Sequence, residues 1–321
     1  MVFVSLETWS VLPILLQNSL RELHKTKGFF IIMIMPKDYY KLHQTQFETF
    51  IDSALKEDIG SGDHSSISCI DNESKSTAVL LTKQDGILAG LDLAAQIFIR
   101  YDPLLEFKPL AVDGSKIVVG SHAFTISGAT QSILATERLV LNTLQRMSGI
   151  ATLTHKLSEK IKHTSCKLLD TRKTTPNFRY AEKWAVHIGG GTNHRMGLFD
   201  ALIIKDNHVD FCGGMNQALQ KTAAYLEQLD VSLDVVVECR NAKEIEQTLP
   251  FSFVSRILLD NHSIPELRRA LHQINHKKPT EASGNINEEN LLAVAETGVN
   301  YISMGALTYD AKSIDLSLKA F

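Results

Sequence analysis

The sequence contains few cysteines, and their positions exclude two kinds of protein. Only four of the 321 residues are cysteines, at positions 69, 166, 212 and 239. They lack the paired spacing of a metal-ligand motif, and they are too scattered for the disulfide framework of a small secreted domain. We therefore interpret them as reduced thiols and predict a cytoplasmic protein. Cys166 and Cys239 lie in apolar runs and are expected to be packing residues.

Long apolar runs and an excess of positive charge are also missing. No segment approaches the ~20 apolar residues that a membrane-spanning helix needs, and the run FFIIMIM at 29–35 is too short. Near the N-terminus the basic side chains follow the apolar run of 11–16, whereas in a signal peptide they precede it. The formal net charge of −3 argues against a general nucleic-acid binder. The sequence thus predicts neither a membrane nor a nucleic acid as a partner.

What is present suffices for two domains, because the chain has 321 residues and a hydrophobic content of 44%. Residues 1–35 are interpreted as a peripheral extension, with a short oligomer-contacting or membrane-surface helix as the alternative. Residues 36–147 mix helical and strand patterns, which predicts an N-terminal α+β domain. Its expected elements are helices at 46–59 and 91–101, strands at 77–83, 105–111 and 116–128, and a helix at roughly 135–162 that is interrupted near Gly149.

The second half has a regular rhythm of short apolar strands and helical segments. Each apolar run stops at polar residues and does not alternate, which is typical of parallel strands covered by helices on both faces. The expected strands are 166–170, 200–205, 233–238, 256–260 and 300–304, with helices at 242–249 and 287–298 between them. We predict an α/β fold in which residues 148–306 form an incomplete α/β barrel of parallel strands, with an open doubly wound sheet as the alternative. Residues 307–321 are expected to return to the N-terminal domain.

Charged residues directly follow or end the predicted strands. Arg172 and Lys173 come after the first strand, and Lys205 comes after the second. Glu238 ends the third strand, and Asp260 ends the fourth. Because the carboxyl ends of parallel strands form the active-site face of α/β folds, these five side chains are expected to converge on one mouth.

The segment 172–205 concentrates positive charge in an otherwise acidic chain. It contains six Lys and Arg against two Asp and Glu, which gives +4 and leaves −7 for the rest. Such a local excess attracts small anions. Arg172 and Arg195 suit bidentate binding of carboxylates or phosphates, whereas the lysines suit phosphate oxygens. His194 can donate a hydrogen bond or titrate near neutral pH.

Two features of this segment have plainer interpretations. Lys183 lies in the helical pattern of 178–191 and is expected to be a solvated surface residue. The three glycines at 189–191 form either a helix C-cap or a flexible loop that presents residues 192–195 to the site.

Glu238 and Asp260 suggest a metal site. A lone carboxylate after a strand is often a helix cap or an ion-pair partner. Two of them in successive units beside a cationic pocket favour Mg²⁺, which commonly bridges carboxylates and substrate phosphates. The small residues of 281–286 and 304–308 follow the late strands, where barrels commonly bind phosphate through backbone N–H groups. We therefore expect a carboxylate-binding cationic wall, a metal–diphosphate wall and a phosphate cradle.

Several long segments together resemble one family, quinolinate phosphoribosyltransferase, also called carboxylating nicotinate-nucleotide pyrophosphorylase. The segments are ATERLVLNTLQRMSGIAT (135–152), DTRKTTPNFR (170–179), GGGTNHRMGLFDALIIKDNHV (189–209), VEC (237–239), LLDN (258–261) and MGALT (304–308). The similarity runs in consistent order over roughly residues 45–321. The sequence departs from the family at Arg240, where many relatives have an acidic residue. It also departs at Ala282 and Asn285, in a segment where many have two serines and two glycines.

The resemblance implies an activity and an assembly. The activity is phosphoribosyl transfer from phosphoribosyl pyrophosphate to quinolinate, giving nicotinate mononucleotide, pyrophosphate and CO₂ in NAD biosynthesis, with Mg²⁺ as cofactor. The assembly is a homodimer, or a hexamer built from dimers, in which Arg138 enters the neighbouring subunit's site. The resemblance also implies roles for single residues. Arg172, His194 and Arg195 would hold the quinolinate carboxylates, and Lys173 and Lys205 would act between the two substrates. Glu238 and Asp260 would bind the ribose hydroxyls and the metal-bound pyrophosphate, and the 5′-phosphate would be bound by Ser283, Gly284 and Gly305. The expected catalytic residues are Lys173, Lys205, Glu238 and Asp260, and the last two are also the metal ligands.

Three other functions fit parts of the pattern. A molybdenum-transport-associated pyrophosphorylase-like protein shares the fold, but the basic residues of 172–195 favour the quinolinate interpretation. A barrel aldolase would use Lys173 or Lys205 as a Schiff base. A non-catalytic protein that binds phosphorylated metabolites is the third, and Glu238 together with Asp260 argues against it.

Overall fold

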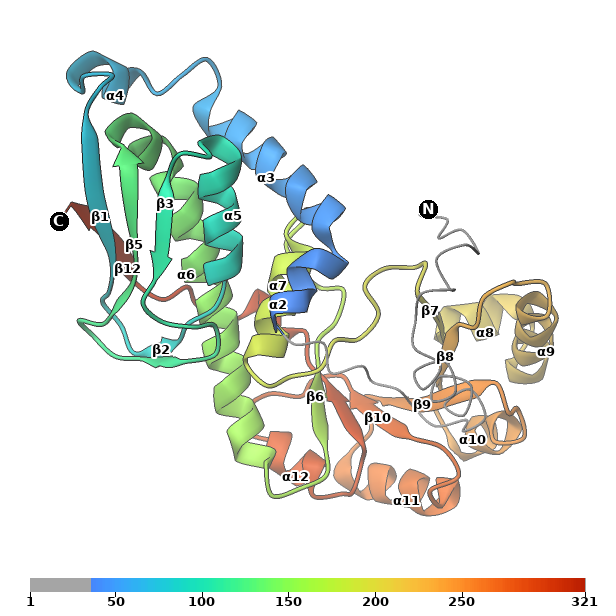
Figure 1. The fold of residues 1–321 in the computed structure, drawn as a ribbon. Coiled ribbons are helices and arrows are strands. Elements are labelled where there is room, and N and C mark those ends of the chain that lie inside the picture. The colour runs from blue at the N-terminus through green and yellow to red at the C-terminus, as the bar shows by residue number, and fades with distance from the viewer. Residues whose placement is uncertain (1–35, 321) are drawn as a thin grey trace, which may run out of the picture. The chain divides into compact units, whose positions relative to one another are not determined.

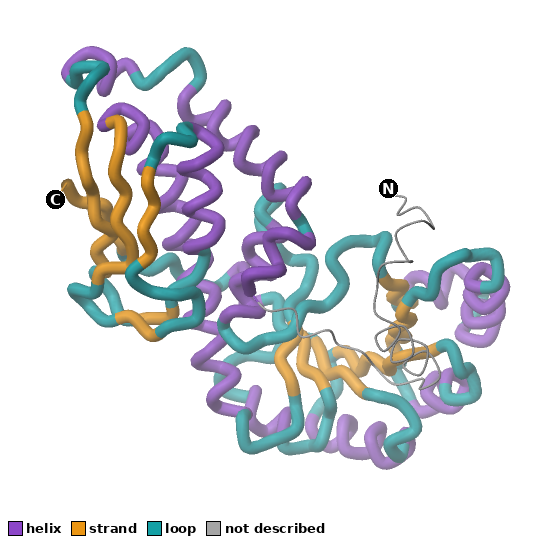
Figure 2. The backbone as a smooth tube through the Cα atoms, viewed as in Figure 1, coloured by secondary structure: helices purple, strands orange, loops and turns teal. Residues whose placement is uncertain are grey.

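The computed structural model describes residues 36–320. The chain divides into two units, Met1–Met35 and Pro36–Phe321, and the predicted extension at 1–35 lies outside the described residues. The described part contains an antiparallel sheet with helices and a parallel sheet with helices (Figures 1 and 2). No helix within residues 36–320 is long and apolar enough to cross a membrane.

The first part is built on a four-stranded antiparallel sheet in the order β12-β1-β5-β3. Its elements are α2 (Pro36–Leu42), α3 (Gln44–Ile59), α4 (His64–Cys69), β1 (Lys75–Thr82), β2 (Gly86–Ile87), α5 (Leu91–Tyr101), β3 (Glu106–Pro109), β4 (Lys116–Ile117), β5 (His122–Ala129) and β12 (Leu316–Ala320). Strand β12 is remote in sequence, yet it pairs with β1, with Ala78 opposite Ala320 and Thr82 opposite Leu316. The predicted helix at 91–101 is confirmed as α5.

The single strand predicted at 116–128 is wrong, because the structure has two strands there. β4 pairs with β2 in a separate two-stranded sheet, whereas β5 joins the four-stranded sheet. Between them the N–H of Ser121 donates to the carbonyl of Val118 across 3.0 Å, and Gly120 has φ +87°. Because glycine adopts this left-handed conformation readily, a sharp turn interrupts the apolar run.

The second part is built on six parallel strands in the order β6-β11-β10-β9-β8-β7. Its elements are β6 (Lys167–Leu169), α7 (Arg179–Ile188), β7 (Ala201–Ile204), α8 (Asp206–Cys212), α9 (Met215–Leu226), β8 (Asp234–Glu238), α10 (Ala242–Thr248), β9 (Val254–Asp260), α11 (Ile264–Ile274), β10 (Thr280–Ser283), α12 (Leu291–Ala295), β11 (Tyr301–Ser303) and α13 (Ala306–Tyr309). Strands β7 to β11 are neighbours in chain order, and β6 pairs with β11. The described residues show no strand pairing between β6 and β7, and Thr192 instead forms a bridge with Leu169.

This strand order is that of a barrel left open on one side. A doubly wound sheet reverses its strand order near the middle, and the strands from β7 to β11 do not. The incomplete α/β barrel predicted from the sequence is therefore confirmed, and the doubly wound alternative is wrong. The sequence prediction omitted β10, and the helix predicted at 287–298 is shorter, at Leu291–Ala295.

Helix α6 (Thr130–Ile161) connects the two parts and contradicts one prediction. It passes through Gly149 without the predicted interruption. A Cβ at Gly149 would lie 2.2 Å from the carbonyl oxygen of Lys312, so the glycine lets the backbone of a distant segment pack against the helix. The domain boundaries predicted at 147 and 306 stay predictions.

Aromatic packing fixes α7 against the first helices. The ring of Tyr39 in α2 stacks on Trp184 of α7, with centroids 5.4 Å apart and planes 14° from parallel. Phe47 of α3 contacts the same indole at 5.4 Å. Figure 1 shows α2 beside α7. The buried position of α7 sets the surroundings of Lys183, which lies one residue before Trp184.

Candidate active site at the carboxyl ends of the parallel strands

The strand register places three of the predicted site residues, Glu238, Asp260 and Ser283, on one face of the sheet. Glu238 of β8 is level with Leu258 of β9, which is level with Glu281 of β10. Asp260 and Ser283 are level with each other, two residues nearer the carboxyl edge. Because paired residues of parallel strands point to the same face, these side chains share one face and rise toward the mouth.

Glu238 and Asp260 form what we term the carboxylate wall. Nζ of Lys205 lies 3.9 Å from Oε2 of Glu238, and Lys205 is 54% exposed, so this contact is loose. Burial raises the pKa of Glu238, Lys205 opposes that shift, and the charge of Asp260 adds to it. Two carboxylates that repel each other at a strand edge suit a cation.

Asp260 is also tied to the predicted phosphate cradle. The hydroxyl of Ser283 donates to Oδ1 of Asp260, and the amide of Asn261 donates to Oδ2 across 2.5 Å. Ser283 and Gly284 line a cavity of about 330 Å³. Gly284 has φ +85°, and a Cβ there would lie 2.2 Å from Oδ1 of Asn261, so the position requires glycine. Asn285 has φ 51°, and asparagine tolerates this conformation better than most residues.

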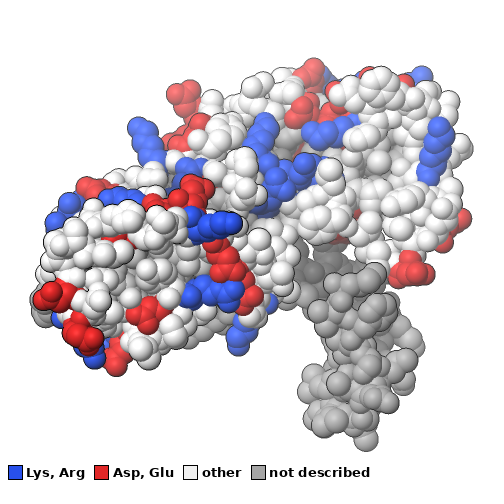
Figure 3. Space-filling model, turned by 90° about the horizontal axis from the view of Figure 1, so that it is seen from above, with Lys and Arg blue, Asp and Glu red and all other residues white. Residues whose placement is uncertain are grey.

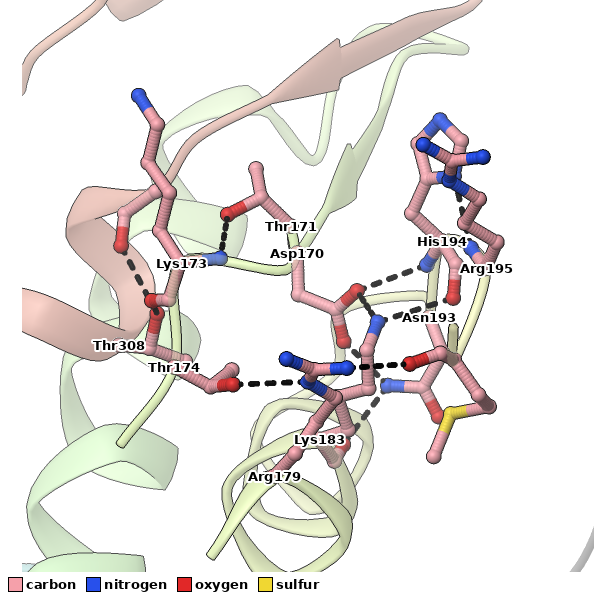
Figure 4. Close-up of polar contacts among 12 residues, drawn as sticks. Asp170, Thr171, Lys173, Thr174, Arg179, Lys183, Asn193, His194, Arg195 and Thr308 are labelled. Atoms are coloured by element: carbon pink, nitrogen blue, oxygen red, sulfur yellow. Dashed lines mark hydrogen bonds and ion pairs between the residues drawn. The ribbon is translucent and has the colours of Figure 1, made fainter. Parts of the chain in front are cut away.

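Gly305 does not line that cavity, but it contacts Lys173. A Cβ on Gly305 would lie 2.8 Å from Cδ of Lys173. The hydroxyl of Thr308 donates to the carbonyl of Lys173 across 2.7 Å, which ties the loop after β6 to α13 (Figure 4). Glycine at 305 therefore leaves room for the lysine side chain at the end of β11.

Four residues, Arg172, Lys173, His194 and Arg195, form what we term the basic wall. Arg172 and Lys173 are exposed. Burial lowers the pKa of Arg195, and the neighbouring charge of Arg172 lowers it further. NH1 of Arg195 donates to the carbonyl of Ala201 across 3.1 Å, while its buried Nε has no partner within the described residues. Two guanidinium groups that disfavour each other's charge favour a bound anion.

The prediction that Lys183 is solvated is wrong. Its side chain is 0% exposed and forms a buried ion pair with Asp170, which is equally enclosed. Nζ also donates to the carbonyl of His194 across 2.9 Å. Asp170 additionally accepts from the side-chain amide of Asn193 at 2.6 Å and from the N–H of His194 at 2.8 Å. Figure 4 shows this network, with Lys173 on one side of Asp170 and His194 with Arg195 on the other.

Of the three glycines after α7, Gly189 and Gly191 are buried and Gly190 is exposed. Gly189 is the C-cap residue, and its N–H donates to the carbonyl of Ala185. A Cβ at Gly189 would lie 2.5 Å from the carbonyl oxygen of Ala151 in α6. The C-cap interpretation is therefore the correct one, and the close contact with α6 holds the chain that leads to His194.

Sequence reasoning also missed Glu281, a carboxylate that is 1% exposed. Its Oε2 lies 3.3 Å from Nε2 of His194 and 3.2 Å from NH1 of Arg256. Burial alone would raise the pKa of Glu281, but His194 and Arg256 hold it below its ordinary value. The sequence of β10, TEAS, has a charged residue at its second position, which could have indicated a site residue. It has no apolar run, however, so the sequence does not mark it as a strand.

Arg138 and Arg240 form no hydrogen bond with these groups, although Arg240 lines a cavity together with Asp260. Arg138 is exposed on α6 and forms no hydrogen bond or ion pair within residues 36–320. Arg240 binds Asp210 at 2.9 Å and Glu244 at 2.7 Å, so its positive charge is paired with two carboxylates. Figure 3 shows Lys and Arg side chains near the middle of one face, with Asp and Glu beside them.

Two sequence models of domains match the part of the chain that carries this arrangement. The model described as the N-terminal domain of quinolinate phosphoribosyl transferase matches residues 63–148. The model described as its C-terminal domain matches residues 150–319. The chain belongs to the quinolinate phosphoribosyltransferase family.

Similar proteins and solved structures agree with this membership. A mitochondrial quinolinate phosphoribosyltransferase (decarboxylating) 2b of Nicotiana tabacum is 43% identical over 83% of this chain and 80% of its own length. A chloroplastic nicotinate-nucleotide pyrophosphorylase (carboxylating) of Arabidopsis thaliana is 42% identical over the same shares. The solved nicotinate-nucleotide pyrophosphorylase of Francisella tularensis superposes with a TM-score of 0.80 at 38% identity, over 86% of this chain and 96% of that one. The predicted family is therefore confirmed.

Proposed function

We propose that this protein transfers the phosphoribosyl group of phosphoribosyl pyrophosphate to quinolinate. The products are nicotinate mononucleotide, pyrophosphate and CO₂, in NAD biosynthesis. The observation that carries the proposal is the gathering of basic residues and two carboxylates at one strand edge, in a chain of this family. The family match favours this function over the aldolase and the non-catalytic binding protein.

Arg172, Arg195 and His194 are proposed to form the quinolinate side of the mouth. Burial and the neighbouring charge of Arg172 lower the pKa of Arg195. A dicarboxylate would relieve that repulsion and accept bidentate hydrogen bonds. Lys173 and Lys205 would lie between this substrate and the phosphoribosyl donor.

Glu238 and Asp260 are proposed to hold Mg²⁺. No group of three or more metal-ligating side chains converges among residues 36–320. Mg²⁺ usually takes only one or two protein carboxylates, with water and substrate phosphates as its other ligands, so this donor pair fits. The mutual repulsion that raises the pKa of Glu238 is what a bound cation would relieve. When bound, the ion supplies charge neutralisation for the departing pyrophosphate.

The side chains of the protein would stabilise charges that develop during the reaction, and none of them would act as a nucleophile. Lys173 and Lys205 would stabilise the negative charge that gathers on the leaving group, and Glu238 would stabilise the positive charge at the ribosyl carbon. Bond formation to the pyridine nitrogen makes the ring cationic. The ring can then accept the electron pair left at C2 when the adjacent carboxylate departs as CO₂.

A shared site in a homodimer, or in a hexamer of dimers, is proposed for Arg138. Its exposure and its lack of partners within the described residues support this role. Arg138→Ala mixed with Lys205→Ala should regain partial activity in heterodimers, because one of the two shared sites would then be intact. Demonstrated heterodimers that stay inactive would contradict the shared site.

The activity is tested by incubating the full chain with quinolinate, phosphoribosyl pyrophosphate and Mg²⁺, and measuring CO₂ and pyrophosphate. Equal amounts of both products are expected, and omission of quinolinate or chelation of the metal should stop their release. Absence of pyrophosphate would contradict the proposal. Borohydride trapping of a carbonyl substrate on a lysine would instead support the aldolase.

The proposed location is the cytoplasm. The tobacco and Arabidopsis relatives are named mitochondrial and chloroplastic, so fractionation of cells that express the full chain is the deciding measurement. Recovery with an organelle fraction would contradict this proposal and leave the proposed activity unaffected.

A further inference from the structure

The surroundings of His194 differ from those expected of a residue that contacts substrate. Its Nδ1 accepts the N–H of Arg195 across 2.7 Å. The other ring nitrogen, Nε2, is buried and makes no hydrogen bond within the described residues, and it lies 3.3 Å from Oε2 of Glu281. Because Nδ1 is an acceptor, the neutral ring carries its proton on Nε2. Nδ1 is therefore used by the backbone, and Nε2 is enclosed beside a carboxylate.

Glu281 lies beneath the mouth and not in it. It is level with Leu258 and two residues below Ser283 on the inward face of β10. Its carboxylate also meets NH1 of Arg256 at 3.2 Å. The Arg256 guanidinium lies 4.7 Å from the centre of the Tyr301 ring, which is level with Glu281 on β11. Glu281 is thus paired with Arg256 of β9, which in turn lies over Tyr301 of β11, and a buried carboxylate needs such a partner.

The backbone of His194 is fixed as firmly as its ring. Its N–H donates to Asp170 and its carbonyl accepts from Lys183, at 2.8 and 2.9 Å. The next residue is Arg195, whose N–H is the group bonded to the imidazole. The position of Arg195 therefore depends on the orientation of the His194 ring, and the Glu281 carboxylate lies 3.3 Å from the other nitrogen of that ring.

We propose that Glu281 is a positioning residue that acts through the His194 imidazole to place Arg195 for the quinolinate carboxylates. His194 then serves the basic wall by its orientation, without a ring nitrogen on the substrate. This inference rests on the proposed function for its kinetic readout, but it also makes a structural claim that holds without turnover.

The structural test uses ¹⁵N-histidine NMR on the full chain. The His194 signals are identified by their absence in His194→Leu, and they should show the proton on Nε2. In Glu281→Gln the Nε2 signal should shift and the tautomer preference should weaken, because the carboxylate acceptor is gone. An unchanged His194 spectrum would overturn the proposal, whether or not the enzyme is active.

The kinetic test compares Glu281→Gln with Asp113→Asn. Asp113 is an enclosed carboxyl in the first part of the chain, where it accepts the N–H of Leu91, so its variant controls for loss of a buried carboxylate alone. Glu281→Gln should raise KM for quinolinate about tenfold and leave KM for phosphoribosyl pyrophosphate within about twofold. Asp113→Asn should change neither. Equal changes in both KM values would overturn the proposal.

A double-mutant cycle separates positioning from general destabilisation. If Glu281 acts through the ring, Glu281→Gln should have little further effect on quinolinate KM once His194→Leu is present. Effects that multiply independently would contradict the proposal. Inactivity of the unmodified protein would instead count against the proposed function, and the NMR test would then decide on Glu281 alone.

Discussion

The two charged walls of the mouth are held in opposite ways. Behind the basic wall, Lys183 and Asp170 form an ion pair in which both side chains are 0% exposed. At the carboxylate wall, Lys205 approaches Glu238 only to 3.9 Å and is 54% exposed. The basic wall is therefore held in place by buried ion pairing before any ligand binds. The charges of the carboxylate wall are only loosely paired and stay available to a ligand. This difference suits a flat diacid that needs a fixed receptor, and a diphosphate that brings its own cation.

The difference is energetic as well as geometric. Burial raises the pKa of Asp170 even though Lys183 and several hydrogen bonds oppose that shift, so the ion pair is costly to assemble. Once assembled, it cannot lose one partner without leaving an unpaired charge in the interior. The stability of the basic wall and the reactivity of the carboxylate wall should therefore respond to different substitutions.

Lys183→Met should have the largest effect on the free energy of unfolding. Removing the lysine leaves the buried Asp170 unpaired, at a cost of about 3–5 kcal/mol. Urea denaturation measures this loss. The control is Lys156→Met, which removes a 57%-exposed lysine paired with Glu288 and should cost less than about 1 kcal/mol. Equal losses of unfolding free energy in the two variants would show that the buried ion pair behind the basic wall contributes no more than an exposed ion pair.

Glu238→Gln should lower kcat by about 10²–10³ without the instability of Lys183→Met. The glutamine keeps the shape but removes the negative charge that attracts a cation and stabilises positive charge at the ribosyl carbon. Steady-state turnover with both substrates saturating is the measurement. Glu288→Gln alters an exposed carboxylate paired with Lys156 and Lys160 and should leave kcat unchanged. A near-normal kcat for Glu238→Gln would contradict its proposed role.

Arg172→Ala should weaken quinolinate binding by about 1.5–3 kcal/mol and leave binding of phosphoribosyl pyrophosphate nearly unchanged. Arg172 has no hydrogen-bond partner within the described residues, so the unfolding free energy should also stay the same. Isothermal titration of each ligand tests this, with Arg100→Ala as the control, since Arg100 pairs with Asp52 at 2.7 Å in the first part of the chain. Equal loss for both ligands would mean that the walls do not divide the substrates.

The smallest expected effect is the pH dependence of stability at Glu238. Its folded pKa is raised above the ordinary 4.5, so above that pH the folded state binds more protons than the unfolded chain. The free energy of unfolding then falls as the pH rises through this interval. Glu238→Gln should therefore gain stability relative to the unmodified protein as the pH rises above about 4.5. A difference that stays constant with pH would show that Glu238 is freely solvated.

Sequence patterns predicted the positions of the charged residues at the strand ends better than those of the buried ion pair behind the basic wall. Lys205, Glu238 and Asp260 follow apolar strands, so their place at the edge needed only the strand prediction. Lys183 was misplaced because helix periodicity assigns charges to the solvent face, and its partner Asp170 belongs to another element. Such pairing depends on packing between elements, which no local pattern records.

The same reasoning explains the other differences between prediction and structure. Glu281 lies in a four-residue strand, TEAS, without the apolar run that marked the other strands. Gly149 suggested a break because glycine weakens helices, but it serves a close contact with Lys312. The turn at Gly120 was hidden inside an apolar run. In each case a contact with a distant segment overrode the local preference.

The pairing of β12 with β1 has a consequence for synthesis of the protein. Strand β1 lies between β5 and β12 in its sheet, and β12 follows every strand of the barrel in the chain. At translation rates of about 5–20 residues per second, β1 leaves the ribosome roughly 10 to 50 s before its second neighbour exists. During that interval one edge of the nascent sheet is unprotected and open to pairing with other chains, so the first part of the molecule is completed only after the barrel has been made.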